Sequence, residues 1–402
     1  MKKEPKYINK NCPSCSFKGI QIFYEVRQVP VHSVLLMSSR EMALTYRKGD
    51  ILLEFCKACG FVYNTTFDAS VHNYSAKYEE TQGFSPTFNV FHRELAQSLI
   101  DKYSLRGKTI IEIGCGKGDF LNLVCEMGDN EGIGFDPAYL SHRDSGAGNA
   151  KVRFIQDFYS EKYANFKSDF VCCKMTLEHI HNPAEFLRVI RNSIGNNYNT
   201  LVFFQVPNFD YVLKDRAFWD IYYEHCSYFT LDSLIHLFRY CGFEVVDSSK
   251  QYDGQYITVT ARPGTENGNM DAAKGLLTER QLNEQKLKIE DFQKECQQSI
   301  RRWKDKIYEM KKAGKRIVIW GGGSKGVAFL TTLNLQKEIE YVVDINPFKH
   351  GTFMAGTGHE IVSPEFLHDY RPDVVIVMNP VYQSEIRKKF QHSGLSPEIL
   401  TV

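Results

Sequence analysis

Residues 109–120 read Thr-Ile-Ile-Glu-Ile-Gly-Cys-Gly-Lys-Gly-Asp-Phe, a short apolar segment that runs directly into a glycine-rich turn. Residues 109–113 have the apolar composition of a buried strand, and a helix is expected over 118–127. Gly114, Gly116 and Gly118 let the intervening backbone pass close to a ligand, because no Cβ stands in the way. The segment therefore predicts a strand–turn–helix unit that binds a ligand at its turn.

Strands and helices alternate along much of the chain around this unit. We expect further strands near 132–135, 152–155, 170–173 and 200–206, and a helix at 183–194. Strands that alternate with helices at this spacing pair in parallel, so the order predicts an α/β fold with a doubly wound sheet. A strand at 316–320 also runs into glycines, which predicts a second, Rossmann-like α/β domain near the end of the chain.

Acidic residues follow the second and third predicted strands of the first sheet. Asp136 would accept hydrogen bonds from a ribose diol, while Asp157 would bind an adenine amino group and Phe158 would cover the base. This combination resembles class I S-adenosylmethionine-dependent methyltransferases over about residues 85–262. The resemblance implies that Glu112 holds the cationic end of the methionine moiety. A nicotinamide-binding Rossmann unit is the alternative, although it usually spaces its glycines Gly-x-Gly-x-x-Gly.

Four cysteines stand in two Cys-x-x-Cys pairs before the first helix: Cys12, Cys15, Cys56 and Cys59. Two residues between thiolates let one turn present both sulfurs to an ion, and two such turns complete a tetrahedron. A closed site leaves no position for a reacting water, so the pattern predicts structural zinc in a small β-rich module. Two unrelated pairs or a redox disulfide are the alternatives. The other seven of the eleven cysteines are interpreted as small buried side chains.

Titratable and aromatic side chains gather in two further segments. Residues 218–230 include Tyr222, Glu224, His225 and Tyr228, and His179 follows the predicted strand at 170–173. Because ligands of α/β sheets bind at the carboxyl ends of strands, we expect the two segments to converge beside the glycine turn. Structural roles are the alternative, with the tyrosines as core aromatics and His225 paired only with its neighbour.

Four features follow one another along the chain: the four-cysteine module, the methyltransferase core, the segment Tyr-x-Glu-His-x-x-Tyr-Phe at 222–229 and the second glycine-rich domain. In that order they resemble the nucleotide-sugar C-methyltransferases of deoxysugar pathways over essentially the whole chain. The resemblance implies methylation of the ring carbon beside a 4-keto group. It implies that His225 is the general base with Glu224 as its neighbour, and that Tyr222, His179 and Tyr78 line the sugar pocket.

The second glycine-rich turn contains Gly321, Gly323, Lys325 and Gly326, and Asp344 ends the next predicted strand. This spacing matches the dinucleotide fingerprint, yet its physical content is a set of backbone N–H groups at a helix N-terminus that face a phosphate. The diphosphate of a nucleotide-sugar substrate satisfies it equally well. We favour that substrate or a purely structural turn over NAD.

Length and charge set the remaining expectations. The chain has 402 residues, 49 Lys plus Arg against 48 Asp plus Glu, and a net charge of +1, which argues against nucleic acid as a partner. No apolar run suits a membrane span or a secretory signal, so we expect a cytoplasmic protein. We expect a zinc-binding module at 1–68, a methyltransferase domain at 69–262, a helical connector at 263–313 and a Rossmann-like domain at 314–402.

The combined reading is an S-adenosylmethionine-dependent C-methyltransferase acting on a nucleotide-linked 4-keto-deoxysugar. His225 would remove the proton beside the ketone, Glu224 would orient its ring, and the resulting enolate carbon would attack the methyl group in line. A tyrosine hydroxyl or His179 would donate to the enolate oxygen. An O-methyltransferase of a sugar or another small molecule is the runner-up. An RNA- or protein-modifying methyltransferase and a non-catalytic nucleotide-binding protein are the other classes.

Overall fold

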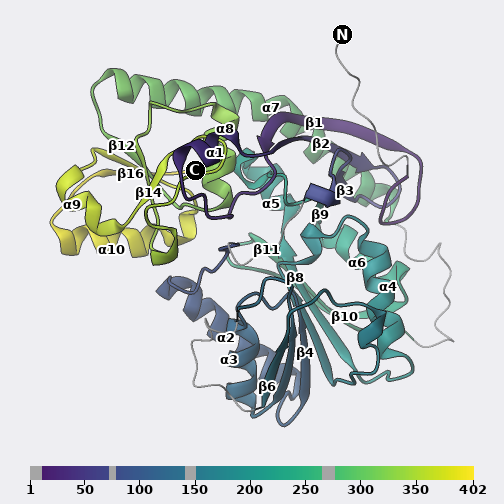
Figure 1. Ribbon diagram of the computed structural model, residues 1–402. Helices are drawn as coiled ribbons and strands as arrows, with labels where there is room; N and C mark the ends of the chain where they lie inside the picture. The colour runs from purple at the N-terminus through teal and green to yellow at the C-terminus, as the bar shows by residue number, and fades with distance from the viewer. Residues whose placement is uncertain (1–10, 72–77, 141–150, 265–276) are drawn as a thin grey trace.

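The computed structural model describes residues 11–71, 78–140, 151–264 and 277–402, which build three β-sheets (Figure 1). The central sheet has the strand order β10-β11-β8-β7-β4-β5-β6. Its strands are β4 (Thr109–Ile113), β5 (Glu131–Phe135), β6 (Val152–Ile155), β7 (Phe170–Lys174), β8 (Leu201–Pro207), β10 (Phe243–Gln251) and β11 (Tyr256–Pro263). The pairs from β6 to β8 are parallel, whereas β11 runs antiparallel to both β8 and β10.

Helices cover both faces of this central sheet, as Figure 1 shows. On one side lie α2 (Pro86–Tyr103) and α3 (Asp119–Gly128), and on the other α4 (Pro183–Ile194) and α6 (Leu231–Tyr240). The sequence signals act locally: Ser85 caps the first turn of α2, and Thr230 and Ser233 form a capping box on α6. The predicted α/β fold with a doubly wound sheet is confirmed.

A second parallel sheet near the end of the chain has the order β14-β13-β12-β15-β16. Its strands are β12 (Ile317–Trp320), β13 (Tyr341–Val343), β14 (Glu360–Val362), β15 (Val374–Val377) and β16 (Glu398–Thr401). The helices beside it are α8 (Ser324–Leu333), the short α9 (Leu367–Tyr370) and α10 (Gln383–Ser393). The second Rossmann-like unit predicted from the glycines after residue 320 is confirmed.

The N-terminal sheet is antiparallel, with the order β1-β2-β3-β9. Three strands come from the first part of the chain, β1 (Ile20–Pro30), β2 (Lys48–Cys56) and β3 (Val62–Asn64), with helix α1 (Arg40–Thr45) between the first two. The fourth, β9 (Ser227–Tyr228), lies far along the chain and begins two residues after His225. The N-terminal sheet therefore holds the segment that was predicted to carry the base.

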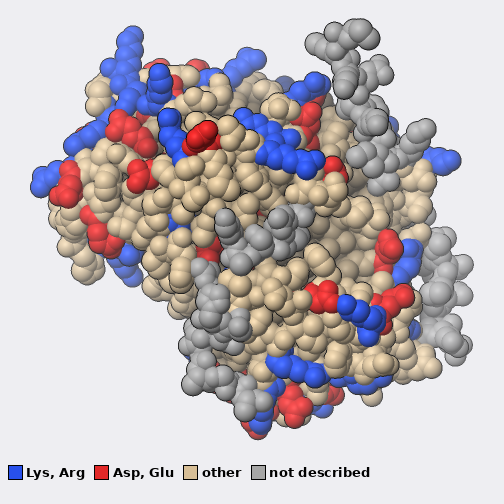
Figure 2. Space-filling view, viewed as in Figure 1, with Lys and Arg blue, Asp and Glu red and all other residues tan. Residues whose placement is uncertain are grey.

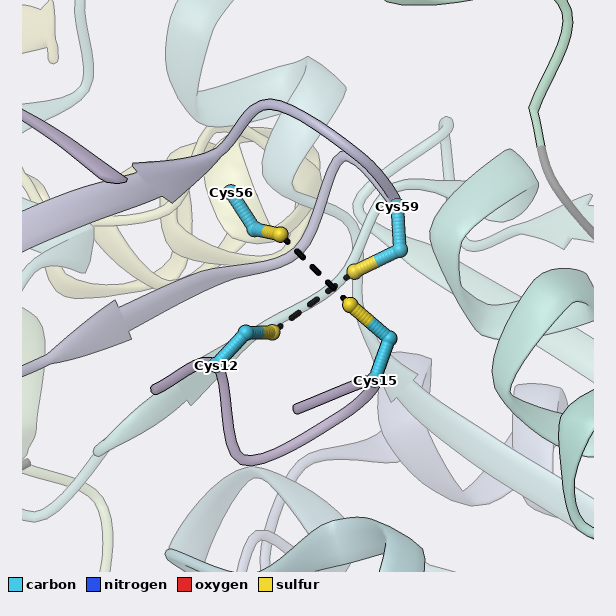
Figure 3. Close-up of side chains that lie close together, drawn as sticks. All are labelled: Cys12, Cys15, Cys56 and Cys59. Atoms are coloured by element: carbon cyan, nitrogen blue, oxygen red, sulfur yellow. Dashed lines mark hydrogen bonds between the residues drawn. The ribbon is translucent and has the colours of Figure 1, made fainter. Parts of the chain in front are cut away.

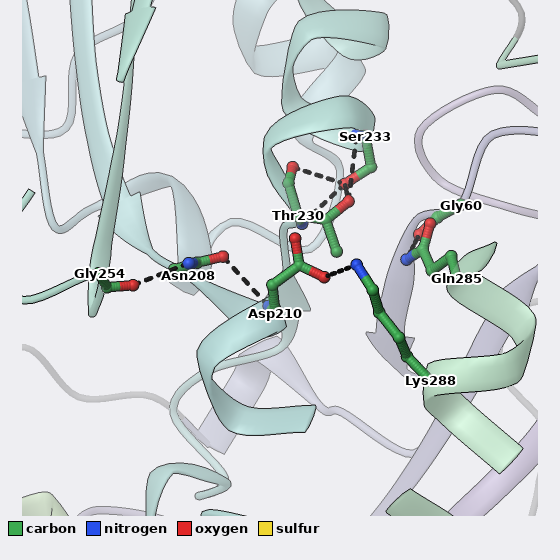
Figure 4. Close-up of polar contacts among 8 residues, drawn as sticks. All are labelled: Gly60, Asn208, Asp210, Thr230, Ser233, Gly254, Gln285 and Lys288. Carbon is green, nitrogen blue, oxygen red and sulfur yellow. Dashed lines mark hydrogen bonds and ion pairs between the residues drawn. The ribbon is translucent and has the colours of Figure 1, made fainter. Parts of the chain in front are cut away.

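A single long helix, α7 (Glu279–Lys312), runs along the top of the view in Figure 1, from the second sheet towards the N-terminal sheet. A helical connector was expected over 263–313; residues 265–276 lie outside the described residues, and α7 begins after its cap, Thr278. Gln285 Nε2 donates to the carbonyl of Gly60 at 2.6 Å, and Lys288 Nζ to Asp210 Oδ1 at 2.8 Å (Figure 4). The helix thus joins the N-terminal sheet to the short helix α5 (Phe209–Asp215).

One hydrophobic core runs through all three parts of the chain. The ring of Phe292 on α7 lies 6.3 Å from that of Phe23 on β1, and Phe218 stacks on Phe329 of α8 at 5.8 Å. These four rings are each less than 5% exposed, and burying such a side chain contributes about 1.5–3 kcal/mol. Side chains from different parts of the chain are therefore held in fixed relation to one another.

The surface shown in Figure 2 carries acidic and basic side chains that are interspersed, as the near-zero net charge implies. Within the described residues, no helix has both the length and the apolar composition that a bilayer crossing requires.

Candidate active site

A cavity of about 810 Å³ is lined by residues from all three parts of the chain. The carboxyl ends of β4, β5 and β7 contribute the first glycine turn, Asp136 and the 3₁₀ turn Leu177–His179. The turn after β12 contributes Gly321, Gly323 and Lys325, and the segment before β9 contributes Tyr222 and His225. Both glycine turns and the predicted base therefore share one cavity.

The first glycine turn connects β4 to α3, and two of its positions demand glycine. Gly114 has φ +71°, and a Cβ there would lie 2.0 Å from Thr176 Oγ1. Gly118 has φ +87°, and its Cβ would lie 2.5 Å from the ring of Phe154. The left-handed backbone and the close neighbours together explain the glycine spacing. The turn consequently exposes backbone to the cavity rather than side chains.

Asp136 and Glu112 present carboxyl groups on the wall beside this turn. Asp136 accepts the N–H of Gly116 at 2.9 Å and that of Ala138 at 2.7 Å; burial raises the pKa of Asp136, and these two bonds limit the rise. Glu112 is 3% exposed, and its Oε2 has no hydrogen-bond partner among the described residues. An orphaned acidic oxygen on a cavity wall fits a cationic ligand group, such as the amino group of S-adenosylmethionine.

Asp157 and Phe158 also line the cavity, but they are more exposed to solvent than we expect for residues that enclose an adenine ring. The Asp157 carboxylate is paired with Lys162 and accepts the Tyr163 hydroxyl at 2.6 Å. The hydrogen bond from Lys162 is the main reason that the pKa of Asp157 is lowered to about 2. Phe158 is 60% exposed. An adenine amino group would share Asp157 with two protein donors.

His225 lies on the opposite part of the cavity wall, with 5% of its surface exposed. Its Nε2 is 2.9 Å from the Tyr222 hydroxyl and 4.0 Å from Glu178 Oε1, and its ring is 4.9 Å from that of His179. Burial lowers the pKa of His225 well below its ordinary value, and the charges of His179 and Lys325 act in the same direction. The ring is therefore neutral and able to accept a proton.

Backbone and side-chain hydrogen bonds connect the segment at residues 177–181 to the segment at residues 222–228. They are Cys226 N–H to the carbonyl of Glu178 at 3.0 Å, His179 Nδ1 to the carbonyl of Glu224 at 3.0 Å, and Ser227 Oγ to the carbonyl of Ile180 at 2.7 Å. The predicted convergence of residues 177–181 with residues 222–228 is thus what the structure shows. One ligand atom each of Glu178, His179 and His225 lies within 4.8 Å of the others; nearness alone is a weak argument for an ion, and we assign none.

Glu224 does not orient the His225 ring, which corrects the sequence-based interpretation. Its Oε1 lies 3.1 Å from His32 Nδ1, and its Oε2 accepts the Ser33 N–H at 2.7 Å and also the Ser33 hydroxyl. Burial raises the pKa of Glu224, but the hydrogen bonds and charge of His32 and the bonds from Ser33 hold it below its ordinary value. The carboxylate therefore anchors the N-terminal sheet, and Glu178 is the acidic group near His225.

Tyr78 lies on the cavity wall and is 8% exposed. Its carbonyl accepts Lys117 Nζ at 3.2 Å, its backbone bridges to Leu35, and its ring lies 6.2 Å from that of His32. Tyr78 therefore lies at the cavity, and its contact with a sugar stays a prediction.

The second glycine turn opens into the same cavity from the C-terminal sheet. Asp344 accepts the N–H of Gly322 at 2.9 Å and pairs with Lys349 Nζ at 3.2 Å, so its carboxylate is engaged inside the protein. Lys325 Nζ lies 2.6 Å from Asp220 Oδ2 and also donates to Gln255 Oε1 at 3.3 Å. Lys325 therefore lines the cavity with its positive charge paired to the Asp220 carboxylate.

The four predicted cysteine ligands converge on one point between two tight turns (Figure 3). The sulfurs of Cys12 and Cys59 are 3.7 Å apart, and those of Cys15 and Cys56 are 3.6 Å apart. A tetrahedron with metal–sulfur bonds of about 2.3 Å has sulfur–sulfur edges of about 3.8 Å. The spacing of the thiols therefore fits zinc.

Four residues at or beside the cavity were missed by the sequence reasoning: Glu178, Lys174, His32 and Ser33. Glu178 directly precedes His179 after a predicted strand, so its position was a usable signal. Lys174 ends β7 and lies 3.2 Å from His92 Nε2. His32 and Ser33 follow β1, where no pattern marks them, and only the tertiary fold brings them to Glu224.

Comparison with known proteins gives two family matches, side by side. A profile described as a methyltransferase domain matches residues 88–248, and one described as a C-methyltransferase C-terminal domain matches residues 253–395. The chain is also similar to C-methyltransferase NovU of Streptomyces niveus, with 26% identity over 317 residues, 75% of this chain and 74% of that protein.

Solved structures with some similarity are also methyltransferases. One is 1,6-didemethyltoxoflavin-N1-methyltransferase of Burkholderia thailandensis, with 16% identity, 45% of this chain and 82% of that chain covered, and a TM-score of 0.34. Another is magnesium protoporphyrin IX methyltransferase of Synechocystis PCC 6803, with 14% identity, 46% and 90% covered, and a TM-score of 0.34.

Proposed function

Because the chain belongs to the S-adenosylmethionine-dependent C-methyltransferases, we propose that it methylates the carbon beside the ketone of a nucleotide-linked 4-keto-deoxysugar. The observation that carries this proposal is the shared cavity, in which the first glycine turn, the neutral imidazole of His225 and the second glycine turn meet. A donor site, a base and a glycine turn at a helix N-terminus are the parts that such a reaction needs.

In this reaction His225 Nε2 takes the proton from the carbon, and the enolate carbon then bonds to the methyl group that S-adenosylmethionine supplies. Tyr222, whose hydroxyl lies 2.9 Å from Nε2, positions the ring before the acceptor binds, and the acceptor takes the place of that hydroxyl at Nε2. Glu112, Asp136 and the turn at 114–118 hold the donor, with Asp157 and Phe158 near its base. The second glycine turn and Lys325 receive the diphosphate.

Two structural assignments accompany the proposal. Zinc held by the four cysteines stabilises the N-terminal module, because binding of the metal adds to the free energy of folding. Since β3 of that module pairs with β9, the metal also helps to fix the segment that contains His225. The division at residues 68, 262 and 313 separates this module, the methyltransferase domain, the connector and the C-terminal domain.

The test uses a panel of 4-keto-6-deoxyglucoses linked to thymidine, uridine, guanosine or cytidine diphosphate. With S-adenosylhomocysteine bound in D₂O, NMR should show deuterium entering the carbon beside the ketone, and with S-adenosylmethionine the product should gain one methylene by mass. His225→Asn should slow both by about 10²-fold or more, while His236→Asn, a buried histidine on α6 outside the cavity, should not. Methylation of a hydroxyl without exchange would favour the O-methyltransferase instead.

A further inference from the structure

Glu178 is a buried acid on the cavity wall for which the proposed reaction has so far named no use. It is 1% exposed, and neither carboxyl oxygen has a hydrogen-bond partner among the described residues. Its backbone is fixed, because its carbonyl accepts the N–H of Cys226 at 3.0 Å. A buried polar group without a partner costs free energy, so such a group on a cavity wall indicates a missing ligand.

The other candidate donors near His225 have protein partners in the structure, whereas the Glu178 carboxyl has none among the described residues. The Tyr222 hydroxyl is in contact with His225 Nε2 at 2.9 Å, and Nδ1 of His179 is bound to the Glu224 carbonyl at 3.0 Å. Glu178 Oε1 stands 4.0 Å from His225 Nε2, which is too far for a direct hydrogen bond. The two atoms lie side by side, so an acceptor placed next to them can put its ketone oxygen roughly 3 Å from Glu178 and its adjacent carbon roughly 3 Å from His225.

We propose that Glu178 is the acid that donates its proton to the ketone oxygen of the acceptor while His225 removes the proton from the adjacent carbon. This inference rests on the proposed function and names the donor that the function requires. Burial raises the pKa of Glu178 to about 8, so the carboxyl is protonated at neutral pH and available as a donor.

The proton and charge balance closes. The carbon–hydrogen bond breaks, its proton goes to His225, and the Glu178 proton moves to the oxygen, which leaves an enol between an imidazolium and a carboxylate. When the enol carbon bonds to the methyl group, the bond from that methyl to the donor sulfur breaks and the sulfonium becomes a neutral thioether. The enol proton returns to Glu178, the ketone re-forms, and His225 releases one proton to solvent.

The experiment compares Glu178→Leu and Glu178→Gln with Glu185→Gln, an exposed residue in the first turn of α4. With S-adenosylhomocysteine and the panel of 4-keto-6-deoxyglucoses, Glu178→Leu should slow deuterium exchange by about 10²–10³-fold. Glu178→Gln, which can donate a hydrogen bond but not a proton, should slow it less, and Glu185→Gln should match the unchanged protein. Exchange by folded Glu178→Leu within threefold of the unchanged protein would overturn the inference.

A second readout needs no acceptor. The infrared difference spectrum between the unchanged protein and Glu178→Gln at neutral pH should contain the stretching band of a protonated carboxyl, and Glu185→Gln should not remove that band. Its absence would show an ionised Glu178 and overturn the inference, even if no sugar in the panel is a substrate. If the unchanged protein exchanges no sugar but the band is present, the choice of substrate fails and the assignment of Glu178 as a neutral acid stands.

Discussion

His32 and Glu224 form a buried pair, and at most 1% of either side chain is exposed. His32 Nδ1 and Glu224 Oε1 are 3.1 Å apart, although the two residues are 192 positions apart in the chain. Ser33, the next residue, donates its N–H and its hydroxyl to the same carboxylate, and its Oγ lies 2.7 Å from the Ser324 hydroxyl, which can donate to it. Ser324 begins α8 directly after the second glycine turn. One carboxylate beside the base therefore connects the N-terminal sheet, the central domain and the C-terminal domain.

Replacing His32 by alanine should destabilise the protein by about 3 kcal/mol, because it leaves a buried carboxylate without its main partner. Urea unfolding followed by the fluorescence of the three tryptophans, of which Trp219 lies in the shared core, measures the loss. The folded pKa of Glu224 is lowered, so the pair contributes fully above the ordinary glutamate pKa of about 4.3, and its contribution is lost as the pH falls further. Equal stability of the two proteins at pH 7 would contradict the pairing.

Loss of zinc should weaken both the fold and the reaction. Cys56→Ser should reduce bound zinc from one equivalent to none and cost about 3 kcal/mol, a fall in Tm of roughly 6–12 °C for a domain of this class. Deuterium exchange should fall as well, because β9 next to His225 pairs with β3 of the zinc module. Cys296→Ser changes a buried cysteine of α7 outside the cluster and should keep the metal. A Cys56→Ser protein that retains full zinc would refute the site.

Donor affinity should depend on pH through Glu112. Burial raises the pKa of Glu112 to about 7, with Lys174 opposing the rise, and the carboxyl must be ionised to hold an ammonium group. The Kd for S-adenosylhomocysteine should therefore be flat above about pH 7 and rise up to tenfold per pH unit below it. Calorimetry measures this, and Glu112→Gln should bind weakly at every pH. A pH-independent Kd in the unchanged protein would exclude the role.

Lys325 should act on acceptor affinity. Lys325→Gln removes a charge that reaches the cavity from the second glycine turn, so KM for the nucleotide-sugar should rise about 10–100-fold with kcat nearly unchanged. A lysine that serves only to balance Asp220 would instead lower Tm and leave KM alone. Lys311→Gln, which breaks an exposed ion pair with Glu340, is the matched control and should change neither.

Local sequence patterns were enough to predict the strands, helices and glycine turn of the central domain. The strand at 109–113, the helix at 183–194 and the glycines between β4 and α3 depend on apolar periodicity and backbone sterics, which act over a few residues. The pairing of the four cysteines was equally readable, since each Cys-x-x-Cys turn is a local structure. The placement of His179 near His225 followed from a general rule for parallel sheets.

The partners of the charged groups depended on tertiary structure. Glu224 and His225 are neighbours in sequence, and sequence alone suggested that they interact, yet their side chains leave the backbone in different directions. Glu224 meets His32 because β9 joins the N-terminal sheet, and His225 meets Glu178 because Cys226 binds the turn after β7. The order of residues thus determined the folds and the first glycine turn, whereas long-range packing, which no local spacing encodes, decided which acid lies beside His225.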